Sequence, residues 1–415
     1  MAADPELQAA TTPRVGLTVI AREWGRIGIT GFGGPPAHIA LLRRLCIDRN
    51  AWLSATEFED GVAATSLLPG PASTQLAIFC AWRLAGPLGA IVGGACFIVP
   101  GLIIILALSA LFLAASPPDW VTGAAAGAGA AVPAVAVSAA TGLVPASWRR
   151  AHPARSGAAG QEAHGGRPLT AASVRWLAYL VAGGVAANLA GQYLVIVLLG
   201  CGLCEWLATG QAGGSGAGGG RNRAERTGLL LGFAAKGITA GAAGSIVWVA
   251  VKVGALSFGG GFVIIPLMQH DAVHTYHWMT TAQFLSAVAL GQVTPGPVVQ
   301  TVAVVGYAAA GLAGGLLAAF VAFAPSFAFV LLGGPHFDRF RRSATAQSFL
   351  AGAGPAAIGA IAGAAVTLGF GLTRLWQVAV LAGAIGWLVL LRKSVVAAIL
   401  AAAAIGVIVT LAGLG

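Results

Sequence analysis

The chain has 415 residues, of which 57% are hydrophobic and only 9% are charged, and its mean hydropathy is +0.85. About a quarter of the residues of a soluble domain are charged, so this composition excludes a water-soluble globular protein. It predicts an all-α polytopic membrane protein. The net charge of +10 would suggest a nucleic-acid partner in a soluble protein. Here most arginines and lysines lie in short loops, as the positive-inside rule describes, so we expect no nucleic-acid partner.

The first apolar segment covers about Val15 to Gly31, and we take it as the first membrane span. It is unusual because it carries Arg22, Glu23 and Arg26. It ends in a glycine-rich break, GFGGPP, at residues 31–36. A polar loop with three arginines follows.

The next two apolar segments, residues 54–68 and 72–84, flank the triplet Pro69-Gly70-Pro71. Each is too short to cross a hydrocarbon core of roughly 30 Å, so we predict a broken or re-entrant helical hairpin. Backbone groups freed at such breaks survive in a bilayer only when they are buried in protein or line a polar cavity.

Two full-length spans, 88–113 and 121–144, complete this part of the chain, and two shorter apolar segments, 174–187 and 193–207, form a pair around Asn188. A linker rich in Gly, Ser and Arg, residues 210–227, then divides the chain. We predict an N-terminal transporter repeat at 1–209 and a C-terminal repeat at 228–415.

The second half repeats the order of the first. Phe258 follows Phe32 by 226 positions, and Pro295-Gly296-Pro297 follows the first Pro-Gly-Pro triplet by the same distance. We predict that this offset holds without a gap, which also pairs Trp52 with Trp278, Phe58 with Phe284, Gly89 with Gly315 and Phe97 with Phe323. A long apolar run to Leu332 and segments 344–370, 378–391 and 395–411 close the chain.

We count five spans plus a hairpin between equivalent points of the repeats, and an odd number inverts the second copy. Charge gives an independent indication: loop 43–49 holds three arginines, whereas its counterpart 269–275 holds no arginine or lysine. The positive-inside rule then predicts opposite orientations. One conflict remains, because this topology puts the N-terminus and Arg14 outside unless the first span is only partial.

The sequences FGGP at 32–35 and LPGP at 68–71, with their second-half copies, resemble the chromate ion transporter family over nearly the whole chain. The resemblance implies two homologous halves in opposite orientation and a multi-pass protein of the bacterial cytoplasmic (inner) membrane. It implies an antiporter-like secondary transporter, not an enzyme, that exports chromate under the proton-motive force and confers chromate resistance. Its partners would be chromate or a related oxyanion, protons and the lipid bilayer, without a cofactor. A homodimer stays open.

Moving a tetrahedral dianion requires hydrogen-bond donors and positive charge rather than a nucleophile. The helices that start after Pro71 and Pro297 can aim unpaired N–H groups at an anion. The candidate substrate-binding residues are the break glycines and the polar residues of these first turns: Gly33, Gly34, Gly70, Ser73, Thr74, Gln75, Gly259, Gly260, Gly296, Gln300 and Thr301. Helix capping and interhelical hydrogen bonds are the open alternative for the polar members.

Arg26 and Lys252 are 226 positions apart, so the repeat pairs them, each shortly before its break. A charge inside a membrane usually faces the bundle interior, and we expect the two cations to neutralise one dianion together. Local pairing, for instance of Arg26 with Glu23, is the alternative. Glu23 is the most embedded carboxylate and our candidate for proton coupling, unless it simply pairs with Arg22 or Arg26.

Three other classes remain open: a carrier of sulfate or another tetrahedral oxyanion, a divalent-cation carrier, and a membrane scaffold that transports nothing. The cation carrier would use a loop rich in possible metal ligands, His270, Asp271, His274 and His277. We expect no metal there, because no second cluster or cysteine lies beside it. The five cysteines, including Cys201 and Cys204 of a lone CxxC, are expected to be small buried hydrophobes.

Overall fold

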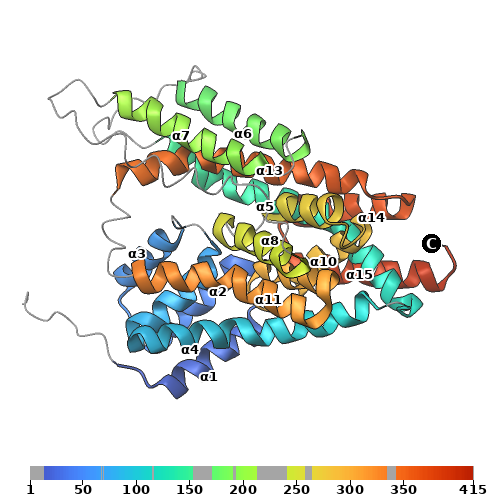
Figure 1. Cartoon of the computed structure of the whole chain (residues 1–415), viewed down its shortest axis with the longest axis horizontal. Coiled ribbons are helices and arrows are strands. Elements are labelled where there is room, and N and C mark those ends of the chain that lie inside the picture. The colour runs from blue at the N-terminus through green and yellow to red at the C-terminus, as the bar shows by residue number, and fades with distance from the viewer. Residues whose placement is uncertain are drawn as a thin grey trace, which may run out of the picture.

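The computed structural model describes residues 14–66, 68, 70–114, 116–152, 171–189, 193–212, 241–257, 264–333 and 343–414, and every regular element in these ranges is a helix (Figure 1). Four helices are long and apolar enough to cross a membrane: α4 (Ala72–Phe112), α5 (Asp119–Ala151), α11 (Thr301–Gly333) with the short turn before it, and α13 (Ala344–Phe370). The chain is thus an all-α, multi-pass membrane protein.

The chain begins with a helical hairpin rather than with a span. Helix α1 (Leu17–Thr30) has 14 residues and is about 21 Å long at roughly 1.5 Å per residue, which is shorter than a membrane core. The backbone then turns through Gly33 and Gly34, at φ of 102° and 71°. Helix α2 (Gly34–Arg43) and the π-helical turn η1 (Arg44–Arg49) return, because Arg49 Nη1 lies 3.6 Å from Glu23 Oε2. Helix α1 is therefore shorter than the predicted first span of residues 15–31, and it forms a hairpin with α2 and η1.

This hairpin brings Arg14 and the basic loop towards the same end of the molecule. The Val15 N–H donates to the Leu84 carbonyl over 3.1 Å, so Val15 lies beside the end of the first segment of α4. Residues 43–49 return to the same end, and Arg14 therefore lies with the basic loop. The count of five spans loses its first member, so the described residues no longer support the parity argument for inversion.

The predicted hairpin around Pro-Gly-Pro is confirmed. Helix α3 (Ala55–Thr65) begins with a capping box in which Ser54 and Glu57 satisfy each other's backbone N–H groups. The chain breaks at Gly70, whose φ of 121° suits only glycine, and α4 starts after Pro71. Non-helical torsions at Ala85 and Gly86 then divide α4 into a short segment and a long span.

The second copy repeats these elements in order. They are α8 (Ala242–Leu256), α9 (Ile264–Gln269), the π-helical turn η4 (His270–Thr275), α10 (Thr281–Val293), the 3₁₀ turn η5 (Val298–Gln300) and α11. Thr280 and Gln283 form the matching capping box, and Gly296 has φ of 99°. The Pro-Gly-Pro break, the π-helical turn and the capped helix therefore recur.

The offset changes by one residue after the second break. Helix α11 bends at Ala310 and Gly311, which lie 225 positions after the bend of α4 at Ala85 and Gly86. The predicted gap-free pairing of Gly89 with Gly315 and Phe97 with Phe323 is therefore wrong. A 3₁₀ turn rises about 2.0 Å per residue against about 1.5 Å in an α-helix, so η5 covers the same length with one residue fewer. The corrected offset pairs Gln75 with Gln300, Gly101 with Ser326 and Pro100 with Pro325.

Helices α4 and α11 pack against each other in antiparallel fashion. A Cβ atom on Gly94 would lie 2.5 Å from the Phe327 ring, and one on Gly315 would lie 2.5 Å from Leu106. Residue numbers rise along α4 as they fall along α11. Within each copy the first helix packs in the same way, because Gly28 approaches the Phe97 carbonyl and its equivalent Gly254 approaches the Ala322 carbonyl.

The outer helices cross between the halves. Helix α5 contacts α15 (Val395–Leu411) through Gly127, whose added Cβ would lie 2.1 Å from the Ala402 carbonyl. Helix α13 contacts α6 (Ala171–Leu189) through Gly359, and α7 (Leu194–Ala212) lies beside it, as Figure 1 shows. Such close contacts through small residues are typical of membrane helices. Helix α14 (Leu375–Ile385) with η7 (Gly386–Leu390) completes the fold.

Candidate functional site

The two Pro-Gly-Pro breaks lie buried between the two copies, and each is held by the other copy. The Gly296 N–H donates to the Gly31 carbonyl over 3.1 Å. Gln300 Nε2 donates to the Ile98 carbonyl over 2.7 Å, and a Cβ on Gly101 would lie 2.1 Å from the Pro295 carbonyl. The second break is thus fixed against α1 and α4.

The first break makes the equivalent contacts in return. A Cβ on Gly70 would lie 3.4 Å from Ser326 Oγ and 3.4 Å from the Gly254 carbonyl. Ser326 is the counterpart of Gly101, so the equivalent position of the other copy faces each break. Reciprocal contacts of this kind are the property of an interface with twofold character.

Unsatisfied buried hydroxyls surround the breaks. Thr74, Ser257 and Ser326 are each fully buried, and their hydroxyl oxygens have no hydrogen-bond partner among the described residues. Leaving such a group without a partner costs about 1–3 kcal/mol, so buried unpaired hydroxyls mark strained or functional places. Thr74 follows the first break directly and Ser326 lies beside Gly70, and such hydroxyl donors suit an oxyanion. Ser257 ends α8, three residues after Gly254, whose carbonyl also lies near Gly70. Ser257 and Ser326 were absent from the sequence prediction, although a serine beside Pro325 in an apolar run was a usable signal.

His38 also lies between the breaks, and sequence reasoning missed it. The ring is fully buried on α2 and lies edge-on to Phe97. Nε2 lies 2.9 Å from the Gly31 carbonyl, so this nitrogen carries hydrogen and donates, while Nδ1 lies 3.3 Å from Ser73 Oγ. The repeat comparison pairs His38 with Ile264 and therefore could not reveal it. The available signal was a lone histidine in an apolar segment directly after a break.

The other predicted polar residues divide into two groups. Ser73, Thr74, Gln75 and Gln300 are buried at the breaks, as expected. Thr301 is buried too, but its hydroxyl donates to the Val298 carbonyl over 2.8 Å, so it caps its own turn. This is the alternative that the sequence left open.

The predicted glycines also differ in position. Gly70 and Gly296 form the breaks, Gly34 lies against Val298 of the second break, and Gly33 is exposed. Gly259 and Gly260 lie outside the described residues.

Among the described residues, the two predicted cations, Arg26 and Lys252, form no hydrogen bond or ion pair with the Pro-Gly-Pro breaks. Lys252 pairs with Asp271 and lies over the Trp248 ring, 5.2 Å from its centroid, with little solvent exposure. Arg26 is exposed on α1 and forms no ion pair within the described part of the chain. Residues 252 and 254 point about 200° apart on α8, so Lys252 faces away from the side that packs at Gly254.

Glu23 is held by two arginines. Its carboxylate lies 3.2 Å from Arg22 and 3.6 Å from Arg49. The pair Glu23–Arg49 joins the first helix to the π-helical turn, as Lys252–Asp271 does in the second copy, with the signs exchanged. Both copies therefore carry one ion pair at this junction, and it is buried on both sides only in the second copy, because the Arg49 side chain is exposed.

The histidine-rich loop does not converge on a common point. Asp271 is engaged by Lys252, and the rings of His270 and His274 are 6.0 Å apart. Within the described residues, no group of three or more His, Cys, Asp or Glu side chains could hold a metal ion. Of the five cysteines, Cys204 is exposed, Cys96 is half-buried and the others are buried.

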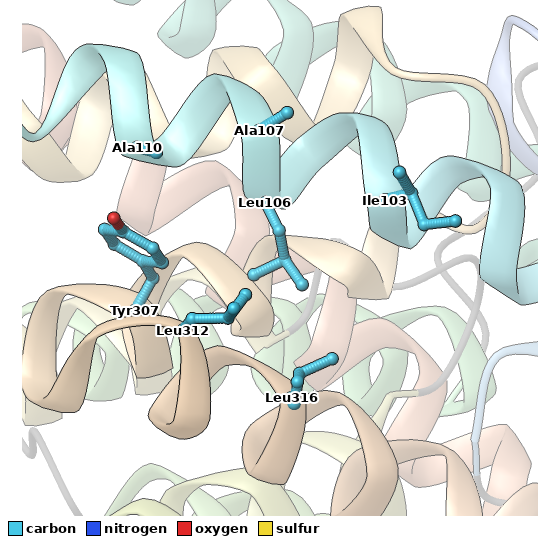
Figure 2. Close-up of a pocket in the computed structure, with 7 residues that line it drawn as sticks. All are labelled: Ile103, Leu106, Ala107, Ala110, Tyr307, Leu312 and Leu316. Atoms are coloured by element: carbon cyan, nitrogen blue, oxygen red, sulfur yellow. The ribbon is translucent and has the colours of Figure 1, made fainter.

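A surface cavity of about 340 Å³ lies between the long segment of α4 and the part of α11 around its bend (Figure 2). Its lining is apolar apart from the Tyr307 hydroxyl, and it consists of Ile103, Leu106, Ala107, Ala110, Tyr307, Leu312 and Leu316. An apolar lining cannot replace the hydration of a dianion, so this cavity is not the oxyanion site.

The chain matches the model of the chromate transporter family over residues 18–206 and 244–407. It is 29% identical to the chromate transport protein of Cupriavidus metallidurans, covering 86% of this chain and 84% of that protein. It is 28% identical to a probable chromate transport protein of Synechococcus elongatus, over 86% of each chain, and 28% identical to the chromate transport protein of Pseudomonas aeruginosa, over 83% and 79%. No solved structure matches the chain. The two matched stretches coincide with the two copies described above and cover most of the sequence, so the chain belongs to the chromate transporter family.

Proposed function

We propose that this protein exports chromate from the cytoplasm across the bacterial inner membrane by secondary transport, driven by the proton-motive force, and so confers chromate resistance. The observation that carries the proposal is the meeting of two helix breaks with the buried hydroxyls of Thr74, Ser257 and Ser326, which have no hydrogen-bond partner among the described residues. The names of the relatives point to the same substrate. The inside-negative potential favours outward movement of an anion by about 2.3 kcal/mol per charge per 100 mV.

The break residues supply donors without full charges. The first turn of α4 starts at Ala72, directly after the break, and its N-terminal N–H groups and dipole favour an anion nearby. The hydroxyls of Thr74 and Ser326 add donors from both copies. Arg26 and Lys252 are the proposed neutralising cations, and Lys252 serves in this role only when Asp271 releases it.

We further propose that the two repeats have opposite orientations in the membrane. The antiparallel packing of the equivalent helices α4 and α11 supports this arrangement, as do the reciprocal contacts of Gly70 with Ser326 and of Gly101 with Pro295. Two inverted repeats can rock about a site at their interface and so expose it alternately to each side.

Glu23 is the proposed proton-coupling residue. Arg22 and Arg49 contact the carboxylate, so coupling through Glu23 requires that these ion pairs open during the transport cycle. Glu23→Gln is expected to leave chromate binding intact while removing the response of transport to a proton gradient. The same measurement on Glu59→Gln, an exposed carboxylate paired with Arg43, is the control.

A sulfate carrier is the second candidate, because sulfate has the same charge and shape as chromate and the hydroxyls at Thr74, Ser257 and Ser326 fit both anions. The decisive experiment is uptake of labelled chromate into inside-out vesicles, with and without a proton gradient, and with competing sulfate. Export predicts uptake that a gradient stimulates and that excess sulfate reduces only weakly. Absence of chromate uptake beyond that of vesicles without the protein would contradict the proposal.

A further inference from the structure

The His38 ring is hydrogen-bonded both to the carbonyl that holds the second break and to the helix that leaves the first break. Nε2–H donates to the Gly31 carbonyl, which also accepts the Gly296 N–H of the second break. Nδ1 faces the hydroxyl of Ser73, on the first turn of α4 after the first break. The imidazole therefore connects the second break, through one shared carbonyl, to the helix that leaves the first break.

When the His38 ring is neutral, its Nδ1 accepts the hydrogen bond that the Ser73 hydroxyl donates. Because Nε2 carries the hydrogen for Gly31, Nδ1 is an acceptor, and Ser73 must donate to it. When a proton adds to Nδ1, this nitrogen becomes a donor to Ser73 Oγ. The Ser73 O–H then turns away and becomes available to another acceptor, and the ring gains a full positive charge.

Among the residues that the structure describes, the hydrogen bonds and the ring contact of His38 involve no other titratable group. The groups that contact His38 are the Gly31 carbonyl at the end of α1 and the Ser73 hydroxyl and Phe97 ring of α4. Beyond the shared carbonyl lies the Gly296 N–H, and α10 and η5 next to it hold no charged residue. The charged residues of α1, α2 and α4 are Arg22, Glu23, Arg26, Arg43 and Arg83; the arginines are exposed, and Glu23 is paired.

We propose that His38 links anion binding at the breaks to protonation: the bound oxyanion accepts the hydrogen bond that protonated His38 frees on Ser73. The inference rests on the proposed function, since it needs an oxyanion at the breaks. Linkage is reciprocal, so the anion raises the proton affinity of His38 by the same factor by which the proton raises the anion affinity. Binding should therefore tighten as the pH falls and should take up as much as one proton.

The test is isothermal titration calorimetry of chromate binding to the purified full-length protein, across a pH series and in buffers of different ionisation enthalpy. His38→Gln keeps an amide donor and an acceptor but cannot titrate. The wild type is expected to bind about tenfold more tightly at low pH, relative to His38→Gln, because a freed hydroxyl donates to an anion. The protonation of chromate itself affects both proteins equally and cancels in this comparison.

His152 offers a matched control. It bridges the Trp148 carbonyl and the Ser173 hydroxyl at 3.0 Å each, in the same pattern, but at the end of α5. His152→Gln should keep the pH response and the proton uptake of the wild type. If His38→Gln does not fold, Ser73→Ala replaces it, since this variant retains the imidazole and should lose most of the gain at low pH.

The outcomes separate the two proposals. Chromate binding with identical proton uptake in the wild type and His38→Gln, or an undiminished gain in Ser73→Ala, overturns the role of His38 and leaves chromate transport standing. Absence of chromate binding to the wild type at every pH contradicts the proposed function itself.

Discussion

At the residue scale, the two copies differ in the ion pair that joins the first helix to the π-helical turn. The acidic residue lies on the helix in the first copy and on the turn in the second. Lys252 lies three positions beyond the equivalent of Glu23, and Asp271 lies four positions before the equivalent of Arg49. Lys252 lies before the glycine-rich stretch at 259–260 and Asp271 lies after it. Both shifts therefore move the second ion pair about one helical turn closer to that stretch in the sequence. Lys252 is therefore better placed than Arg49 to exchange its partner for an anion.

A pair of variants separates these roles of Lys252. Lys252→Gln leaves a buried Asp271 carboxylate without its partner, which is expected to destabilise the fold by roughly 3–5 kcal/mol. Adding Asp271→Asn removes the second charge and should restore the melting temperature. Chromate affinity should stay low in the double variant if Lys252 neutralises the substrate. Wild-type affinity in the double variant would reduce Lys252 to a structural partner.

Arg26 is expected to behave differently, because it is exposed and unpaired within the described residues. Arg26→Gln should leave thermal stability unchanged and weaken chromate binding. Unchanged affinity would remove Arg26 from the site.

Ser326→Ala tests the hydroxyls at the breaks. The change removes a fully buried donor that has no described partner, so we expect no loss of stability. Chromate affinity should fall by about tenfold or more, because a hydrogen bond to a charged group contributes about 1.5–3 kcal/mol. Ser109→Ala is the control: Ser109 is equally buried, on α4, but its hydroxyl already donates to the Ile105 carbonyl over 2.7 Å. Equal affinities in the two variants would count against an anion at Ser326.

At the element scale, the sequence predicted the broken hairpins well and the first helix badly. Pro-Gly-Pro and the capping residues fix where α3 and α10 begin and end, so local chemistry was sufficient there. A 17-residue apolar segment looks like a span whether or not the chain turns back after it, and only Glu23–Arg49 reveals the return. Repeat comparison likewise favours residues that both copies share, and it therefore passed over His38 and the extra residue after Pro71.

The break glycines are expected to matter for transport more than for insertion. Gly70 and Gly296 have φ of 121° and 99°, which valine cannot adopt without strain, so Gly70→Val or Gly296→Val should abolish export. Gly86→Ala is the matched control, because φ is 65° there and nothing lies within 4 Å of an added Cβ. Export assays and immunoblots of membranes measure both effects. Loss of the valine variants from the membrane would indicate a structural role.

At the scale of the whole molecule, the halves interlock. Helix α5 of the first half packs on α15 of the second, and α13 of the second half packs on α6 of the first. Each break is also held by the opposite copy. Each half therefore covers helices of the other, and a movement of one copy must change the surroundings of both breaks.

Opposite orientation of the two copies predicts opposite accessibility of equivalent residues. Asp48 and His274 are equivalent, exposed positions on η1 and η4. In a background where Cys96 and Cys204 are replaced by serine, Asp48→Cys and His274→Cys each add one accessible thiol, since the other native cysteines are buried. The basic loop next to Asp48 belongs inside by the positive-inside rule, so a membrane-impermeant thiol reagent should label His274→Cys in intact cells and Asp48→Cys only after permeabilisation. Labelling of both variants from the same side would contradict the inverted arrangement, because two copies with the same orientation present equivalent loops to the same compartment.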